Sequence, residues 1–186
     1  MKYLSIILLG SFLYACNNPK KNSAIAIKTD AVADVGVPKS LSSYIKEKQP
    51  GWSLPDTSDY SKVWWSWYER DQIPYYVTTD INDDEVSDYA VILKKSNSVQ
   101  LHILISSGNT YIPWIDHDFK PSYAKTGLNI EHGLSAVSPG HLDFVVNGKE
   151  QSLSLVTNGI TLVELENITK IYYWADGKLK VMNVRS

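Results

Sequence analysis

The stretch that decides the fold class is "HLDFVVNGKEQSLSLVTNGITLVELENITKIYYWADGKLKVMNV", residues 141–184. Its short apolar or alternating runs are separated by the dipeptides Asn147-Gly148, Asn158-Gly159 and Asp176-Gly177. Asn-Gly and Asp-Gly suit the two positions of a tight hairpin turn at which φ is positive. The stretch therefore predicts three successive hairpins, which together make an antiparallel meander.

Four runs upstream also have the length and the residue types of strands. Turn residues separate them, and they cover residues 73–79, 89–94, 99–106 and 111–115. Before them, residues 40–49 show a helical pattern that Ser40 is expected to cap and that Pro50-Gly51 ends. The predicted fold class is α+β, mostly β: an antiparallel meander sheet with one short N-terminal helix.

The first residues have the features of a secretory signal. A basic start is followed by the apolar run "YLSIILLGSFLY", residues 3–14, which is too short to span a membrane. The segment Leu13-Tyr14-Ala15-Cys16 resembles the lipobox of bacterial lipoproteins, in which the cysteine is lipidated and becomes the first residue. Cys16 is also the only cysteine in the chain, so no disulfide forms within it. We expect lipidation of Cys16; the alternative is an ordinary signal peptide with an incidental cysteine.

The predicted organisation has three parts. Residues 1–15 are a lipoprotein signal peptide, residues 16–39 a tether, and residues 40–186 one β-rich globular domain. The expected location is the bacterial cell envelope, with the membrane reached through the lipid anchor. The lack of an acidic run after Cys16 favours the periplasm-facing side of the outer membrane. A formal net charge of −2 excludes the basic field that nucleic-acid binding requires.

An acidic stretch, "TTDINDDEVSDYAVIL", spans residues 78–93. Alternate positions have the spacing by which an EF-hand-type loop wraps calcium, with side-chain oxygens at four positions and a backbone carbonyl at a fifth. The candidate ligands are Asp80, Asn82, Asp84, Val86 (carbonyl) and Asp88. Glu85 stands where such loops have glycine, and Val91 where an EF-hand has its bidentate glutamate.

Because this loop leads into a strand, it resembles the calcium loops of FG-GAP-type exported β-proteins. That resemblance implies a calcium ion as cofactor. The alternative is a solvated acidic connection between two strands.

Three of the six tryptophans fall in "VWWSWYER", residues 63–70. On a strand, Trp65 and Trp67 would share one face, because successive side chains alternate. Two exposed indoles on that face could stack on a sugar ring or on an apolar surface of a partner. The alternative is that these aromatic side chains belong to the core.

Two groups of titratable residues are candidates for metal or acid–base chemistry: Asp116-His117-Asp118 and Glu131-His132. No HExxH motif, GxSxG elbow or glycine-rich phosphate loop is present in the sequence. His102 alternates within an apolar run and is expected to be structural. Carboxylate-based hydrolysis stays open, since sequence spacing does not reveal distances in space.

The segment "GITLVELENITKIYYWADGKLKVMNV" resembles a type of small bacterial lipoprotein. In that type an acidic loop precedes a "DYAV" strand and a "YYW-DG" hairpin ends the domain, so the resemblance implies a fold and export but no activity. The first hypothesis is an exported, lipid-anchored β-rich binding or accessory domain with an optional structural calcium. Its partner would be an envelope protein or glycan, and an inhibitor or immunity-type lipoprotein is a special case. The second hypothesis is a carboxylate-based envelope hydrolase.

Overall fold

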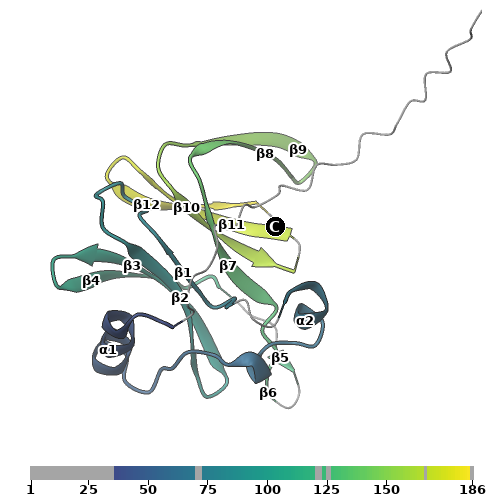
Figure 1. Ribbon diagram of the computed structural model, residues 1–186. Coiled ribbons are helices and arrows are strands. Elements are labelled where there is room, and N and C mark those ends of the chain that lie inside the picture. Colours follow the sequence, from purple (N-terminus) through teal and green to yellow (C-terminus); the bar gives the residue numbers. More distant parts are fainter. Residues whose placement is uncertain (1–35, 70–72, 120–122, 125–126, 166, 185–186) are drawn as a thin grey trace, which may run out of the picture.

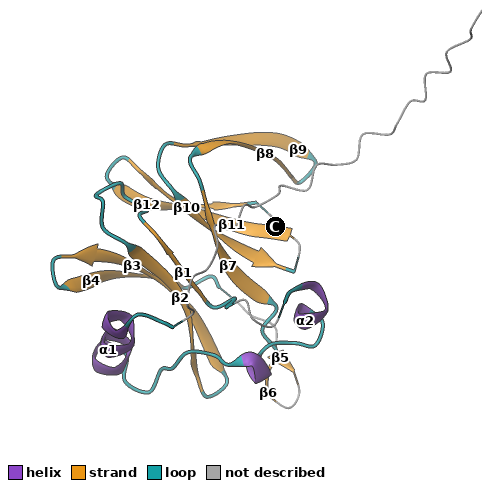
Figure 2. Cartoon of the chain, in the orientation of Figure 1, coloured by secondary structure: helices purple, strands orange, loops and turns teal. Residues whose placement is uncertain are grey.

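Most of the described chain lies in antiparallel strands. The computed structural model describes residues 36–69, 73–119, 123–124, 127–165 and 167–184 (Figures 1 and 2). The helices are α1 (Lys39–Lys48) and α2 (Trp64–Trp67), with a 3₁₀ turn at Thr57–Asp59. The strands are β1 (Tyr76–Thr79), β2 (Asp88–Lys95), β3 (Ser98–Ser107), β4 (Thr110–Asp116), β5 (Tyr123–Ala124), β6 (Gly127–Leu128), β7 (His132–Val137), β8 (Gly140–Val146), β9 (Lys149–Leu155), β10 (Gly159–Glu164), β11 (Asn167–Ala175) and β12 (Lys178–Asn183).

The strands form two four-stranded sheets within the described residues. The first sheet has the order β1-β2-β3-β4, and the second has the order β12-β11-β10-β7. All of their pairings are antiparallel, and β5-β6 and β8-β9 are separate two-stranded hairpins. The predicted fold class, mostly β with antiparallel sheets and little helix, is confirmed. The strands make two sheets rather than one meander.

Strand β2 is buried on both of its faces. Ala90 and Ile92 point into a core shared with the second sheet, while Val91 and Leu93 point toward α1. All four side chains are at most 1% exposed. A strand buried on both faces has a continuous apolar run instead of an alternating one, which explains the sequence Tyr89–Leu93.

The larger core lies between the two sheets. The first sheet contributes Leu101, Ile103 and Ile105 from β3, next to the inward residues of β2. The second sheet contributes Leu134, Ile160, Leu162 and Tyr172. A backbone hydrogen bond of 2.8 Å, from the Leu134 N–H to the Pro74 carbonyl, also joins β7 to the segment before β1.

Helix α1 covers the opposite face of the first sheet (Figure 1). Leu41 and Ile45 are its buried residues, and they pack on Val91, Leu93 and Leu104. The helix starts and ends one residue before the predicted limits. Ser40 lies inside the helix and does not cap it; Pro38 precedes the first turn and no side chain caps it.

Two of the three predicted hairpin turns are confirmed. Asn147 and Gly148 join β8 to β9 with φ of 51° and 74°, and Asp176 and Gly177 join β11 to β12 with φ of 54° and 71°. These positive values are the ones that Asn-Gly and Asp-Gly favour.

The third predicted hairpin is wrong. Gly159 begins β10, which pairs with β11 and β7 and not with β9. The glycine is required by space instead, since a Cβ there would lie 3.0 Å from the Tyr172 carbonyl oxygen. Asn158 donates a side-chain hydrogen bond to the Asp80 carbonyl. The β8–β9 hairpin is therefore separate, and its Leu142 and Phe144 share a small apolar cavity with Thr161 and Ile171 of the second sheet.

The predicted signal peptide, Cys16 and most of the tether lie outside the described residues. Where the description begins, Val37 already packs against the cluster beneath α1, two residues before that helix. None of the described helices is long and apolar enough to cross a membrane.

We expect Gly133→Ala to destabilise the fold. A Cβ at Gly133 would lie 2.8 Å from Cζ2 of Trp64, which is itself 2% exposed. Overpacking of this kind costs about 1–3 kcal/mol, and the smaller gain from replacing a glycine offsets only part of it. Denaturant unfolding would measure the loss in the free energy of unfolding.

Gly36→Ala is the matched control, because nothing lies within 4 Å of a Cβ at Gly36. Equal unfolding free energies for Gly133→Ala and the control would contradict the packing of Trp64 on β7.

Candidate functional site

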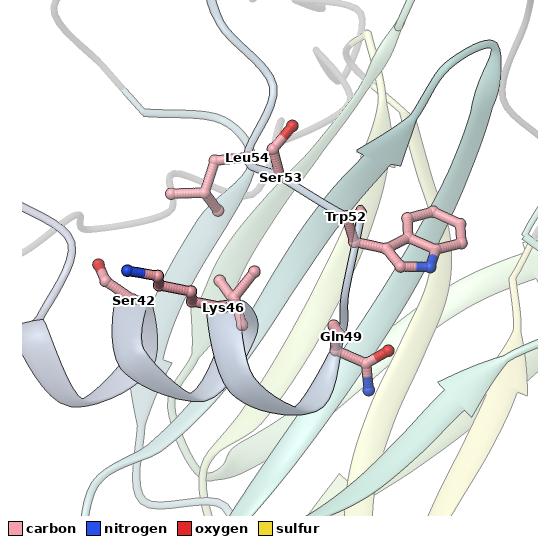
Figure 3. Close-up of a pocket in the computed structure, with 8 residues that line it drawn as sticks. Ser42, Lys46, Gln49, Trp52, Ser53 and Leu54 are labelled. Atoms are coloured by element: carbon pink, nitrogen blue, oxygen red, sulfur yellow. The ribbon is translucent and has the colours of Figure 1, made fainter.

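A groove of about 330 Å³ lies between α1 and the segment that follows it (Figure 3). One wall is a single face of α1, formed by positions that follow the helical repeat. The other wall is the extended chain after the helix. The lining residues are Ser42, Ile45, Lys46, Gln49, Gly51, Trp52, Ser53 and Leu54.

The second wall of the groove is fixed by backbone hydrogen bonds. The Trp52 N–H donates to the Gln49 carbonyl at 3.0 Å, and Gly51 has a φ of 82° in the turn between them. Ser53 and Lys94 exchange two backbone hydrogen bonds of 2.9 and 2.8 Å. The groove is therefore held open between α1 and an extension of the first sheet.

The side chains around the groove combine apolar and cationic groups. Ile45 and Leu54 supply apolar surface, and Lys46 projects from the last turns of α1 (Figure 3). The Lys95 side chain passes Gly51, with its Cε 3.2 Å from the place of a Cβ there. Neither lysine has an acidic partner among the described residues. The groove therefore suits an acidic ligand with an apolar side chain.

The Trp52 indole turns away from the groove. Figure 3 shows its ring directed away from Ser42 and Lys46, and its centroid lies 6.2 Å from that of His102. His102 is fully buried on β3, and its Nε2 lies 3.1 Å from Oε1 of Gln100. Its Nδ1 has no partner among the described residues. Burial lowers the pKa of His102 to about 4, as expected for a structural histidine.

The acidic loop between β1 and β2 is held together by its own carboxylates. Asp80 accepts hydrogen bonds from the backbone N–H groups of Asp84 at 3.1 Å and Glu85 at 2.8 Å. Asp88, fully buried, accepts from the N–H groups of Ile81 at 3.0 Å and Ser106 at 2.8 Å. Backbone N–H groups in a tight loop need acceptors, and this accounts for much of the acidic cluster.

Two of the predicted calcium ligands, Asn82 and Asp84, contact each other in this loop. Asn82 donates to Asp84 at 2.9 Å, and Oδ1 of Asn82 is buried without a partner among the described residues. Glu85, at the glycine position of such loops, has the positive φ of 64° that the sharp turn requires.

Asp88 is turned toward β3, where Ser106 occupies one of its oxygens. Val86 has an exposed side chain, and its N–H donates to Asp84. Within the described residues, no three His, Cys, Asp or Glu side chains are arranged to hold a metal ion. The calcium ion stays a prediction.

The predicted strand geometry of the tryptophan segment is wrong. Residues 64–67 form the short helix α2, in which the Ser61 hydroxyl accepts a hydrogen bond from the Trp64 N–H at 2.8 Å. Trp65 packs against the core and its indole N–H donates to the Thr57 carbonyl. Trp67 is 53% exposed. Residues two apart on a helix point in different directions, so Trp65 and Trp67 do not form one aromatic face.

The candidate residue Asp116 is engaged in contacts between the two sheets. Its Oδ2 lies 2.6 Å from Nζ of Lys170 and accepts a hydrogen bond of 2.6 Å from the Tyr172 hydroxyl. Its Oδ1 accepts from the Asp118 N–H at 2.9 Å. Burial raises the pKa of Asp116, but these contacts outweigh it and hold the pKa below its usual value.

Sequence reasoning missed Lys170 and Tyr172. The signal that would have found them is the alternation of β11, because Lys170 occupies the same face as Tyr172 and Trp174. The latter two are aromatic core residues, and a lysine in line with them needs a buried partner.

The other titratable candidates are dispersed. His132 is buried against Phe119, with a ring-centroid distance of 5.3 Å, and burial lowers its pKa. His117 and Asp118 are exposed. Neither the groove beside α1 nor the small cavity under β8 is lined by Asp116, Asp118, Glu131 or His132.

Comparisons of this chain with protein-family models, with curated proteins and with solved structures found no match. Function is therefore inferred from the chain's own residues.

We expect calcium to raise the melting temperature by about 3–6 °C at about ten times its dissociation constant. Extracellular-type sites have dissociation constants of roughly 0.1–1 mM. A calcium concentration about ten times the dissociation constant stabilises a fold by about 1.4 kcal/mol, which sets the expected shift. Asp84→Asn should reduce the shift, because it removes one ligand charge and keeps the acceptor for the Val86 N–H. Differential scanning fluorimetry with calcium and with chelator would measure it.

Asp83→Asn is the matched control, since the Asp83 side chain is exposed and asparagine tolerates its φ of 62°. Identical melting curves of the wild-type protein in calcium and in chelator would leave the loop as a turn closed by its own carboxylates.

The free energy of unfolding should fall as pH drops from about 6.5 toward about 4. In this window His102 takes up a proton in the unfolded chain and stays neutral in the fold, so acid favours unfolding. One such proton contributes a slope of about 1.4 kcal/mol per pH unit. His132, whose pKa burial also lowers, acts in the same direction. Denaturant titrations at several pH values would measure the slope.

His102→Leu should reduce this slope by the contribution of one proton, about 1.4 kcal/mol per pH unit. His141→Leu, at an exposed position, serves as the control. If wild type and His102→Leu keep the same slope, His102 is not neutral in the fold.

Proposed function

We propose that this protein is a lipid-anchored binding protein of the bacterial envelope, and that the groove beside α1 holds an extended, acidic and apolar segment of a protein partner. The groove is the observation that carries this proposal. Its two walls are fixed by the helix and by the backbone bonds of Ser53 to Lys94. A site formed before binding loses little conformational entropy when its ligand arrives.

The shape of the groove favours an extended ligand. Its helical wall runs from Ser42 to Gln49, which is about 10 Å at 1.5 Å per residue. An extended peptide covers that length with about three residues. Ile45 and Leu54 would contact an apolar side chain of such a peptide, and Lys46 in the groove and Lys95 beside Gly51 would attract its carboxylates.

The aromatic side chains favour a protein over a glycan. Stacking on a sugar ring needs an exposed indole face. The Trp52 ring is directed away from the groove, and Trp65 and Trp67 do not share a face. A partner that is a toxin or a hydrolase would make the protein an inhibitor or an immunity-type lipoprotein, which is a special case of the same proposal.

The contacts of the Asp116 carboxylate argue against the second hypothesis, a carboxylate-based hydrolase. Both of its carboxylate oxygens are occupied, by Lys170 and Tyr172 on one side and by the Asp118 N–H on the other. A general acid or base needs a position within hydrogen-bond reach of its substrate. His132 is buried as well.

The proposals that the protein is exported and lipid-anchored rest on the signal segment and on Cys16. A lipid chain at Cys16 would place the domain on the end of a tether that begins at the membrane surface. The expected site is the periplasm-facing side of the outer membrane. A calcium ion in the loop after β1 would be a structural addition and not part of the groove.

Binding of defined peptides to the full-length protein in detergent tests this proposal. A fluorescent nonapeptide that alternates Glu and Leu should bind, and a Lys-Leu peptide of the same pattern should not. Lys46→Glu should weaken binding of the acidic peptide by about tenfold, equivalent to about 1.4 kcal/mol. Fluorescence anisotropy at constant ionic strength would measure both dissociation constants.

Lys149→Glu is the matched control, because it makes the same change of charge on β9, far from α1 in Figure 1. Equal losses of peptide affinity in Lys46→Glu and Lys149→Glu would mean that the peptide responds only to the net charge of the protein. The groove would then not be the binding site. Cys16→Ser should leave peptide binding unchanged and abolish incorporation of labelled fatty acid, which separates the test of the groove from that of the anchor.

A further inference from the structure

The contact between Lys170 and Asp116 joins the two sheets at the end of β4. Asp116 is the last residue of β4 in the first sheet, and Lys170 lies on β11 in the second. They are 54 positions apart in the chain, and Nζ of Lys170 lies 2.6 Å from Oδ2 of Asp116. The side chains are 14% and 5% exposed.

The surroundings of this pair are mainly apolar and aromatic. Tyr172, fully buried, packs edge-on against Trp114 with a ring-centroid distance of 5.7 Å. Leu101 is the neighbour of Asp116 in register, and Leu162 is that of Lys170; both are at most 2% exposed. Apolar surroundings make each charge costly unless it is paired, and here Lys170 and Asp116 pair with one another.

We propose that Lys170 and Asp116 condense to an intramolecular isopeptide bond that joins the two sheets covalently. A lysine amine that has lost a proton is a nucleophile, and the fold holds Lys170 against a single carboxyl group that can accept that proton. Such proximity replaces a bimolecular encounter by a unimolecular step.

The contacts of Asp116 divide its two oxygens into different roles. Oδ1 accepts the Asp118 N–H at 2.9 Å, a donor positioned to stabilise negative charge on that oxygen during the addition. Oδ2 lies 2.6 Å both from Nζ of Lys170 and from the Tyr172 hydroxyl. Protons can therefore reach Oδ2, which makes it the leaving oxygen.

The condensation balances without a co-reactant. A proton moves from Nζ to Oδ2, giving the amine and the acid. The nitrogen lone pair attacks Cγ, and the electrons of the carbonyl π bond move to Oδ1. When they return, the bond from Cγ to Oδ2 breaks, a second proton passes from nitrogen to Oδ2, and water leaves. The product is a neutral amide between Nζ and Cγ, and Tyr172 ends with the proton it began with.

The rest of the chain gives such a bond a structural role. Extracytoplasmic domains often hold their parts together with disulfides, and this chain has a single cysteine. An isopeptide bond would close a long loop across the core and so restrict the unfolded chain, as a disulfide does. This inference does not depend on the groove or on its ligand.

Mass spectrometry of the denatured full-length protein tests the proposal. The wild-type chain should be lighter by one water than its processed sequence. Lys170→Arg and Asp116→Ala, processed in the same way, should have their unmodified masses. Trypsin should fail to cleave the wild-type chain after Lys170, because the acylated lysine carries no charge, and a branched peptide containing Asp116 and Lys170 should appear in the digest.

Lys180→Arg is the matched control. Lys180 pairs with Asp176 at the surface, where the Asp176 side chain is 78% exposed, so this variant should keep the loss of water. A wild-type mass equal to that of the unmodified sequence overturns the proposal and leaves a buried ion pair. A loss of water that persists in Lys170→Arg overturns it too, because dehydration at Asp176-Gly177 to a succinimide has the same mass.

Discussion

The burial of β2 on both of its faces determines how the two sheets and α1 are arranged. Each fully buried aliphatic side chain contributes about 1.5–3 kcal/mol by leaving water, and this strand carries such side chains on alternate faces. One face therefore needs α1, and the other needs the second sheet. Asp88, the first residue of β2, is buried with them. Its carboxylate is matched by two backbone N–H groups, one from the loop before it and one from β3.

The acidic loop follows from the same constraint. Between β1 and β2 the chain reverses direction, and the N–H groups of this turn need acceptors. Asp80 does so for the residues after it, and Asp88 for Ile81. Thr157 and Asn158 then bind the carbonyls of Ile81 and Asp80 from the start of β10. The loop is thus one of the places where polar contacts join the two sheets, whether or not it holds an ion.

The sequence predicted those parts of the fold whose cause is local. The turns at Asn147-Gly148 and Asp176-Gly177 follow from the φ values of two neighbouring residues, and α1 follows from its apolar spacing. The dipeptide Asn158-Gly159 shows the limit: no hairpin turn forms there, and Gly159 instead begins β10, which pairs with β7. That choice depends on residues far away in the chain. The strand predicted for the tryptophan segment was wrong for a related reason: a helix of four residues is too short to show a helical period in the sequence.

The sites were less predictable for the same reason. The groove combines one face of α1 with the chain after it, and Lys95 from the end of β2 lies beside its Gly51; no spacing in the sequence brings these together. Asp116 was identified as a candidate, but its partners come from β11. The acidic loop was the exception, since its bonds between Asp80 and residues 84 and 85 are local.

The separate β8–β9 hairpin has a consequence for how this chain tolerates change. It is inserted between β7 and β10, which pair directly with one another, and both of its own strands pair only with each other within the described residues. Its length and the residues of its turn are therefore uncoupled from the register of the second sheet. A foreign sequence inserted at Asn147-Gly148 would be carried at the surface while both sheets keep their pairing.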